Sequence, residues 1–424
     1  MKKYVFLVLT AFLCMCHSTE GLSEEKIIFT TPLSLEQCLA IAEVHHPNLK
    51  ASRAKIDVAD SQMGQVASKE RPQVDVSSSY SRQESSAARD GDTYSTSAGI
   101  SQLITDAGKT KAEKSIARLK KESASQNYKT IECQVQYNVK KTYFDALEAQ
   151  KDLEVAEETL NLYTLLLTQA QAFYDVGSVP KYDVTTAEVE QSKARLGVVT
   201  AKTAIKKARA ELNNAMGVTE APEYVLKDVE ERVSFSIPFD EVLKTALRKR
   251  ADLLASEIGV KAAKESIRLA AKGNAPEVRA SGKYAIGGSH PTEDDNWSVG
   301  VTLQIPLYDG GLEGEKINQA RAELVVAEGE EESLRSDVRK EVEQAYMEFI
   351  DSDEVLSVAQ KTVQQAEENL TIAQNRYKVG VGSPIEVADA TEKFKEAKQG
   401  YWSALYSHHR SWAALEKVVG GTVE

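Results

Sequence analysis

Two pairs of adjacent histidines, His45–His46 and His408–His409, have the side chains best suited to metal chemistry in this sequence. Both pairs lie in helical patterns, and neighbouring residues on a helix point about 100° apart, so the members of one pair cannot readily bind the same ion. The sequence has no Cys-x-x-Cys pair and no Gly-x-Ser-x-Gly elbow, and the glycines of AIGGSHP fit a strand-to-strand turn. We therefore expect no enzyme, no metal site and no cofactor.

Two of the four cysteines lie in a short apolar run that follows two lysines at the N-terminus. The run is too short to cross a bilayer, so residues 1–21 are predicted to be an export signal. Lipidation of Cys16 stays open, although Met15 replaces the small residue usually found before a lipidated cysteine. Cys38 and Cys133 remain. A disulfide between them is possible, but their spacing does not support it.

The composition favours long helices and argues against nucleic acid as a partner. Hydrophobic residues make up 42% of the chain, enough to bury a core, and aromatic residues only 7%. The formal net charge is -12, so the surface would repel a polyanion.

The sequence contains an internal repeat. Residues 33–49 resemble residues 237–253, and FYDVGSVPKYDVTTAEVEQSKAR at 173–195 matches RYKVGVGSPIEVADATEKFKEAK at 376–398. Each half has the same predicted order: a short helix, a medium helix, two strands, a very long helix, a tight turn and another long helix. The predicted organisation is a signal peptide at 1–21, a first repeat at 22–215, a connector at 216–238 and a second repeat at 239–424.

The very long helices carry apolar residues at steps of three and four, which predicts antiparallel coiled-coil packing. In the second repeat this seam runs from Ile317 to Tyr377, and in the first it runs from Val139 to Tyr174. At about 1.5 Å per residue such a helix is on the order of 100 Å long, far beyond a globular diameter.

Four segments of about ten residues alternate apolar and polar side chains, the pattern of β-strands with one apolar face. No predicted helix has a face left over to cover them, and ten residues suffice for a tilted strand to cross a bilayer. We therefore expect lipid to cover the apolar face. Its residues are Val74, Val76 and Tyr80; Tyr94, Ala98 and Ile100; Val278, Ala280, Tyr284 and Ile286; and Trp297, Val299, Val301, Leu303 and Ile305.

A membrane sheet must close, because an open edge would leave backbone groups unpaired in hydrocarbon. Four strands cannot close, so several copies must share one barrel. Two copies would give eight strands and a packed interior, and three would give twelve strands with room for water, which suits the Ser-, Gly- and Thr-rich inner faces. The alternative is a soluble helical rod that carries a small antiparallel sheet.

The junction QIPLYDGG at 304–311 and the turns YDVGSVPKYDV and YKVGVGSPIEVADA resemble those of TolC-type outer-membrane efflux proteins. The resemblance extends over nearly the whole mature chain. It implies a homotrimer: a twelve-stranded barrel in outer-membrane lipid, continued by an α-helical barrel through the periplasm. It also implies an exit duct of a tripartite efflux pump or a type I secretion system, working with a periplasmic adaptor (membrane fusion) protein and an inner-membrane transporter. The alternative is a periplasmic coiled-coil scaffold or adaptor that conducts nothing.

The resemblance also implies a gate at the periplasmic tip. Glu386 and Asp389 match the family's inward-facing acidic rings, and a spacing of three residues places them on one helix face. Crowded carboxylates attract cations, which predicts a gate sensitive to pH and divalent ions. The alternative is an ordinary solvated acidic face. Tyr377 matches a gate tyrosine and Asp183 its acidic partner.

Gly382 occupies the position of the family's gate arginine, so we expect a looser closed state or a substitute such as Lys181. Glycines followed by prolines break the helices to form the two turns, which are also the expected adaptor contacts. The turn residues are Gly177, Pro180, Gly380, Gly382 and Pro384.

Overall fold

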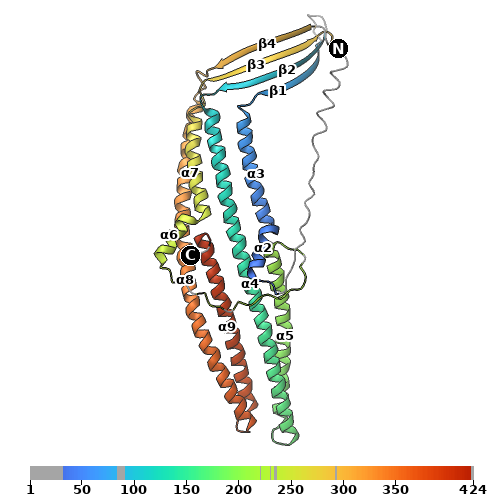
Figure 1. The fold of residues 1–424 in the computed structure, drawn as a ribbon. Coiled ribbons are helices and arrows are strands. Elements are labelled where there is room, and N and C mark those ends of the chain that lie inside the picture. The colour runs from blue at the N-terminus through green and yellow to red at the C-terminus, as the bar shows by residue number, and fades with distance from the viewer. Residues whose placement is uncertain are drawn as a thin grey trace.

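The computed structural model describes residues 32–83, 91–219, 221–229, 231–233, 236–291 and 294–421. The signal peptide expected at 1–21, including Cys16, lies outside these residues. Long helices run side by side in an elongated body, with a sheet at one end and two helical hairpins pointing away from it at the other (Figure 1). Mostly helical structure with a small β part is the fold class that the sequence predicts.

The described elements follow the same order twice. The first set is α2 (Leu35–His45), α3 (Pro47–Ser68), β1 (Gln73–Gln83), β2 (Gly91–Thr105), α4 (Lys109–Asp175) and α5 (Lys181–Met216). The second set is α6 (Phe239–Lys249), α7 (Ala251–Ala270), β3 (Glu277–Gly288), β4 (Asp294–Gln304), α8 (Leu312–Lys378) and α9 (Pro384–Val419).

The two very long helices, α4 and α8, have 67 residues each. At about 1.5 Å per residue each is on the order of 100 Å long, as predicted. All the seam residues predicted in α8 are buried or half-buried, and Ile317 and Tyr377 mark the limits of that seam. In α4 the prediction is wrong for Tyr174, which is 40% exposed, because the helix turns Ala170 and Phe173 inward instead.

Aspartates fix the entry from each strand pair into its long helix. Asp106 accepts hydrogen bonds from the backbone N–H groups of Gly108 and Thr110, at 3.0 and 2.6 Å. Asp309 accepts from those of Gly311 and Glu313, both at 2.9 Å. These bonds satisfy N–H groups that a helix start leaves unpaired, so the strand-to-helix turn is a defined structure in both halves.

The four strands form one antiparallel sheet in the order β1-β2-β3-β4. The register aligns the apolar residues of all four strands: Val76 lies opposite Ala98, Ala98 opposite Tyr284, and Tyr284 opposite Trp297. In the described chain β1 and β4 each have one neighbouring strand, so each leaves one edge unpaired.

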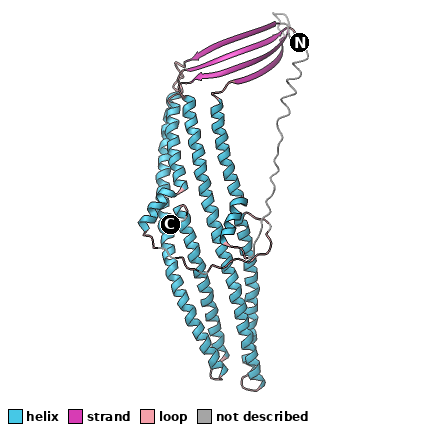
Figure 2. Ribbon diagram, in the orientation of Figure 1, coloured by secondary structure: helices cyan, strands magenta, loops and turns pink. Residues whose placement is uncertain are grey.

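None of the described helices covers the apolar face of this sheet. Figure 2 shows the strands beyond the ends of the helices rather than packed on them. Val76, Trp297 and Val299 are 73%, 75% and 78% exposed. Exposure of this extent costs free energy in water. The face is therefore still predicted to be covered by something other than the described helices.

Two tyrosines anchor the segments that lead into each half. Tyr143 on α4 is fully buried and donates to the carbonyl oxygens of Leu33 and Lys227, at 3.2 and 2.6 Å. Tyr346 on α8 donates to the carbonyl oxygen of Ile237 at 3.3 Å. Tyr143 therefore holds both the first segment and the connector against the core.

The cysteine and membrane-helix questions have short answers. Cys38 and Cys133 are both free, so the disulfide left open by the sequence does not form. Among the described residues, none of the helices combines the length and the apolar character that crossing a membrane requires.

Candidate functional site

The tips of the two helical hairpins contain every residue that the sequence predicts for the gate. In the first turn Gly177 has φ +76°, and its neighbour Ser178 donates from its backbone to the carbonyl oxygen of Phe173 at 2.8 Å. Gly380 has φ +80° at the equivalent place in the second turn. This left-handed backbone closes the C-terminus of a helix and favours glycine at both positions.

The prolines stand where the second helix of each hairpin begins. Pro180 directly precedes α5, and Pro384 is the first residue of α9, where its missing N–H costs nothing. Ser383 caps α9 by accepting from the backbone N–H of Glu386 at 3.3 Å. The turns thus have the geometry that the sequence indicates, with the proline displaced by one position between them.

Gly382 is required by close packing. A Cβ atom at this position would lie 2.9 Å from the backbone nitrogen of Tyr377 and 3.1 Å from the carbonyl carbon of Arg376. The Gly382 N–H donates to the Arg376 carbonyl oxygen at 3.0 Å, which holds the backbones this close. A side chain at position 382, including the arginine implied by the resemblance, does not fit this turn.

Tyr377 and Asp183 come from different hairpins, and both lie at the hairpin tips. Tyr377 is 2% exposed and packs edge-on against Phe173 at 5.5 Å between ring centroids. Burial, and then the charge of Asp183, raise the pKa of the Tyr377 hydroxyl. This hydroxyl is buried without a hydrogen-bond partner among the described residues.

The two carboxylates predicted for the acidic rings are exposed and paired with cations of their own hairpin. Arg376 Nε lies 3.5 Å from Glu386 Oε2, and Lys393 Nζ lies 2.7 Å from Asp389 Oδ2. All four side chains are about half exposed or more, so solvent screens these pairs and they hold the carboxylates weakly. Arg376 is the cation that the structure places beside Glu386.

A buried cluster joins the two hairpins just behind the tip. Tyr163, Leu370 and Phe394 belong to it, and the Tyr163 hydroxyl donates to the carbonyl oxygen of Ala388 at 3.2 Å. Sequence reasoning placed Tyr163 only in the helical seam and missed this bond between hairpins. Arg376 was also missed, although its position one residue before Tyr377 was the available signal.

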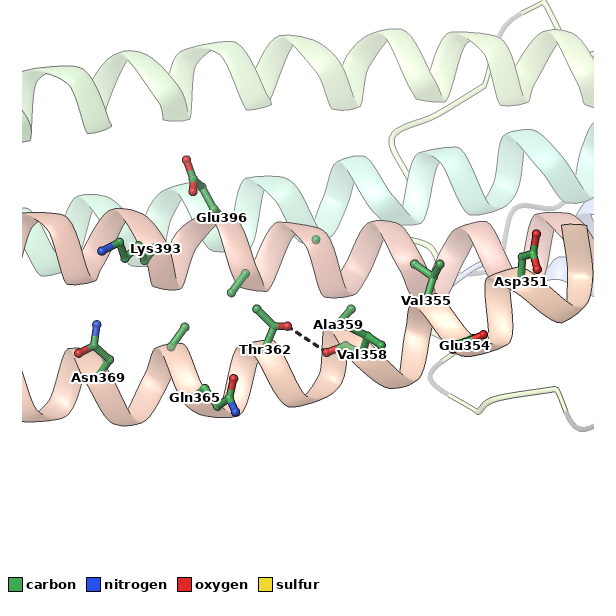
Figure 3. Close-up of a pocket in the computed structure, with 13 residues that line it drawn as sticks. Asp351, Glu354, Val355, Val358, Ala359, Thr362, Gln365, Asn369, Lys393 and Glu396 are labelled. Carbon is green, nitrogen blue, oxygen red and sulfur yellow. Dashed lines mark hydrogen bonds between the residues drawn. The ribbon is translucent and has the colours of Figure 1, made fainter.

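Grooves follow the helices above the tip. One of about 940 Å³ lies between α8 and α9 and is lined by Val355, Val358 and Ala359 of α8 and by Lys393 and Glu396 of α9 (Figure 3). A second, of about 820 Å³, lies between α9 and the first hairpin. Both are open and mainly apolar, as expected of surfaces between helices rather than of a substrate pocket.

The histidine pairs serve the fold. His46 ends α2 and its Nδ1 accepts from the Asn48 backbone N–H at 3.2 Å, so the prediction that His45 and His46 share one helix is wrong. His408 lies in the core of α9 with Nε2 3.1 Å from the Val233 carbonyl oxygen. A carbonyl can only accept, so this nitrogen carries a proton. Within the described ranges no group of three or more potential ligands could hold a metal ion.

Comparison with known proteins agrees with this architecture. The family model described as outer membrane efflux protein matches residues 39–218 and again 242–421. Outer membrane protein TolC of Escherichia coli is 24% identical over 410 residues, which cover 91% of this chain and 82% of that protein. Outer membrane protein TolC of Vibrio cholerae is 25% identical over 390 residues and covers 89% of each chain.

A solved structure gives the same result for the fold. The Campylobacter jejuni CmeC outer membrane channel superposes with a TM-score of 0.80 at 18% identity, covering 95% of this chain and 90% of that one. The uncovered sheet face, the paired hairpins and the double match to one model therefore have a common explanation. The chain belongs to the outer membrane efflux protein family, and its place in the cell is the outer membrane with an extension into the periplasm.

Proposed function

We propose that three copies of this chain form a passive channel that serves as the exit duct of a tripartite efflux pump or a type I secretion system. The observation that supports this most directly is the sheet: its apolar face is uncovered and its two edges are unpaired. In a membrane, lipid would cover the apolar face, and β4 of one copy would pair with β1 of the next so that no edge stays unpaired.

The number of copies follows from the polar face of the same sheet. Ser77 and Ser97 lie opposite each other there, and their hydroxyls are 3.0 Å apart. Eight strands from two copies would pack such side chains into a dry interior, whereas twelve strands from three copies leave room for water. The polar face favours the homotrimer with a wet lumen.

The helices offer matching contacts between copies. Apolar side chains along α8 and along α5 are between 46% and 69% exposed in the single chain, which is costly in water and is expected at an interface. Packing of α8 against α5 of the next copy would extend the barrel through the periplasm. The exposed residues are Val325, Val326, Met347, Ile350, Val355, Val358 and Ile372 on α8, and Val189, Leu196 and Val199 on α5.

The hairpin tips are the proposed gate. Three-fold symmetry would place Glu386 and Asp389 in rings around the axis, with Tyr377 and Asp183 joining neighbouring hairpins behind them. Because the ion pairs of both acidic residues are exposed, the carboxylates are available to cations at low cost. The turns around Gly177 and Gly380 would contact the adaptor protein, and the adaptor would link the duct to an inner-membrane transporter.

We also infer that the two halves arose by duplication, with boundaries at 22–215 and 239–424. The repeated order of elements supports this, as do the equivalent bonds of Tyr143 to Leu33 and of Tyr346 to Ile237.

The test is a matched pair of charge substitutions in β4. Val301→Asp puts a charge on the apolar face, and Ser298→Asp puts the same charge on the polar face of the same strand. A charge on a lipid-facing strand costs free energy that is greatest at mid-membrane, so only the first should reduce the yield of trimers in outer-membrane extracts. Trimers are detected by cross-linking, and wild-type trimers should conduct in a planar bilayer.

Two results would contradict the proposal. One is equal tolerance of both substitutions. The other is a wild-type protein recovered from the periplasm as a soluble, non-conducting monomer, which would favour a coiled-coil scaffold.

A further inference from the structure

The chain between β4 and α8 contains the two most exposed large hydrophobic side chains of the described residues. Leu307 and Tyr308 are 91% and 89% exposed, and Ile305 and Leu312 on either side are 51% and 54% exposed. The last ladder residue is Gln304, so this segment continues the apolar side of β4 past the sheet and ends at Asp309, which caps α8. In Figure 1 it lies where the sheet meets the helices.

The aromatic residues at the other end of the sheet show how the strands are inclined. Tyr80 of β1 lies opposite Tyr94 of β2. Tyr284 of β3 lies opposite Ala98, which is four residues nearer the helices than Tyr94, and Trp297 of β4 lies opposite Tyr284. A band that runs level around a barrel of tilted strands must cross the register rows in this way. The aromatic residues therefore descend toward the helices from β1 to β4.

The lower limit of the apolar band must descend in parallel. On β1 it ends at Val74, which lies opposite Ile100. On β4 Leu303 pairs with Val278, the first apolar residue of β3, and the paired residues end at Gln304. The lower limit of the apolar band on β4 therefore lies beyond the paired residues. Trp297 and Leu307 are ten residues apart, and each residue of a strand adds about 3.3 Å. At a tilt of about 45° this length spans about 23 Å along the membrane normal. An outer-membrane barrel has an apolar band about 25 Å tall.

We propose that Leu307 and Tyr308 form the periplasmic boundary of the lipid-facing band. Leu307 lies among the acyl chains of the inner leaflet, and Tyr308 lies at the phospholipid headgroups, where its ring is in hydrocarbon and its hydroxyl in water. This proposal rests on the proposed barrel. The second repeat alone supplies the aromatic residue of this boundary, because the equivalents of Leu307 and Tyr308 in the first repeat are Ile104, which is 59% exposed, and Thr105.

Spin labels test the position of each residue in liposome-reconstituted trimers. Cysteine is introduced singly at Val301, Leu307, Tyr308 or Glu315 in a Cys133→Ser background, while Cys38 stays because burial makes it inaccessible. Collisions with oxygen report lipid, and collisions with a water-soluble nickel chelate report water. We expect oxygen to dominate at 301 and 307, nickel at 315, and comparable values at 308.

The outcomes separate the two proposals. Nickel dominance at 307 with oxygen dominance at 301 overturns the boundary and leaves the barrel. Nickel dominance at 301 overturns the barrel itself.

A second variant covers the case in which cysteine at 307 prevents assembly. Leu307→Trp is made in a Trp297→Phe background and compared with Trp297→Phe alone in vesicles of phospholipid with brominated acyl chains. Additional fluorescence quenching from Trp at 307 supports the proposal, and unchanged quenching overturns it.

Discussion

The two hairpin tips have matching sequences but different surroundings. Tyr174 and Tyr377 occupy equivalent positions of the matched segments 173–195 and 376–398, each three residues before a glycine with positive φ. Tyr174 is nevertheless 40% exposed, whereas Tyr377 is 2% exposed. The turn is a local structure that the repeat specifies twice, but the burial of the tyrosine depends on which hairpin lies beside it.

The reason is that one chain brings the hairpins together on one side only. Tyr377 packs against Phe173 of the first hairpin, and the residue equivalent to Phe173 in the second hairpin is Arg376. In the proposed trimer Tyr174 would face the second hairpin of the next copy. The difference between the tips thus teaches that duplicated halves serve as complementary, and not interchangeable, surfaces.

The largest effect is expected from the charges that distinguish the tips. The second hairpin contributes Glu386 and Asp389, and the equivalent residues of the first are Asp183 and Thr186. Glu386→Gln with Asp389→Asn removes two carboxylates per copy and should weaken divalent-cation block of single-channel current by about tenfold, which is about 1.4 kcal/mol. The measurement is the blocking concentration of Mg²⁺ in planar bilayers.

The first hairpin supplies the control. Thr186→Val should leave the blocking concentration unchanged, because no charge is lost. If the double variant also leaves it unchanged, the acidic-ring assignment is wrong and the carboxylates belong to a solvated face.

The next effect concerns acid stability, where the halves differ in the core. His409 of α9 stacks on Phe144 at 4.7 Å, whereas the equivalent residue of α5 is the exposed Lys206. Burial, and then His408, lower the pKa of His409 to about 4. In the unfolded chain this histidine takes up a proton near pH 6.5, whereas in the folded chain it stays neutral down to about pH 4. The free energy of unfolding therefore has its full value above pH 6.5 and decreases as the pH falls toward 4.

At about 1.36 kcal/mol per pH unit, this loss amounts to about 3 kcal/mol. Urea unfolding at several pH values measures it. His409→Gln should flatten the dependence between pH 6.5 and 4, and Lys206→Gln should leave it intact. An unaltered slope in the His409 variant would assign the acid sensitivity to other groups.

Much of the fold could be predicted because it follows from periodicity within the chain. The strands alternate and the seam of α8 steps by three and four, so local patterns were sufficient for Val299 or Leu370. Tyr174 was placed in the core because its spacing fits the seam, but its burial depends on a neighbouring hairpin that periodicity does not encode. His46 was misassigned because Pro47 starts a new helix there.

The site was predicted less completely, for a related reason. Resemblance identified Tyr377 and Asp183, which lie at the tips of different hairpins, where the charge of Asp183 acts on the Tyr377 hydroxyl. It did not identify Arg376 beside Glu386, nor the bond from Tyr163 to Ala388, because both depend on side-chain geometry across elements. Gly382 was read as a lost arginine, and only the 2.9 Å approach to the Tyr377 backbone shows that no side chain fits.

A smaller effect is expected where the halves use the same bond unequally. Tyr143 serves two carbonyl oxygens and is fully buried, whereas Tyr346 serves one and is half-buried. Tyr143→Phe should cost about 1–2 kcal/mol of unfolding free energy, because the part-buried bond to the Lys227 carbonyl is lost together with that to Leu33, and Tyr346→Phe should cost about 0.5–1 kcal/mol. Urea unfolding ranks the two variants, and equal costs would show that the connector needs no such anchor.

The smallest effect returns to the two tip tyrosines and has the opposite sign. The Tyr377 hydroxyl is buried without a partner among the described residues, and an unsatisfied buried hydroxyl opposes folding. Tyr377→Phe should therefore stabilise the isolated chain in detergent by up to about 1 kcal/mol, whereas Tyr174→Phe, at an exposed site, should change little. Thermal unfolding of monomer and trimer compares them. A loss of stability confined to the trimer would mean that assembly gives this hydroxyl an acceptor, for which Asp183 is a candidate because its charge already acts on the hydroxyl. The gate would then be held by a bond that the single chain does not make.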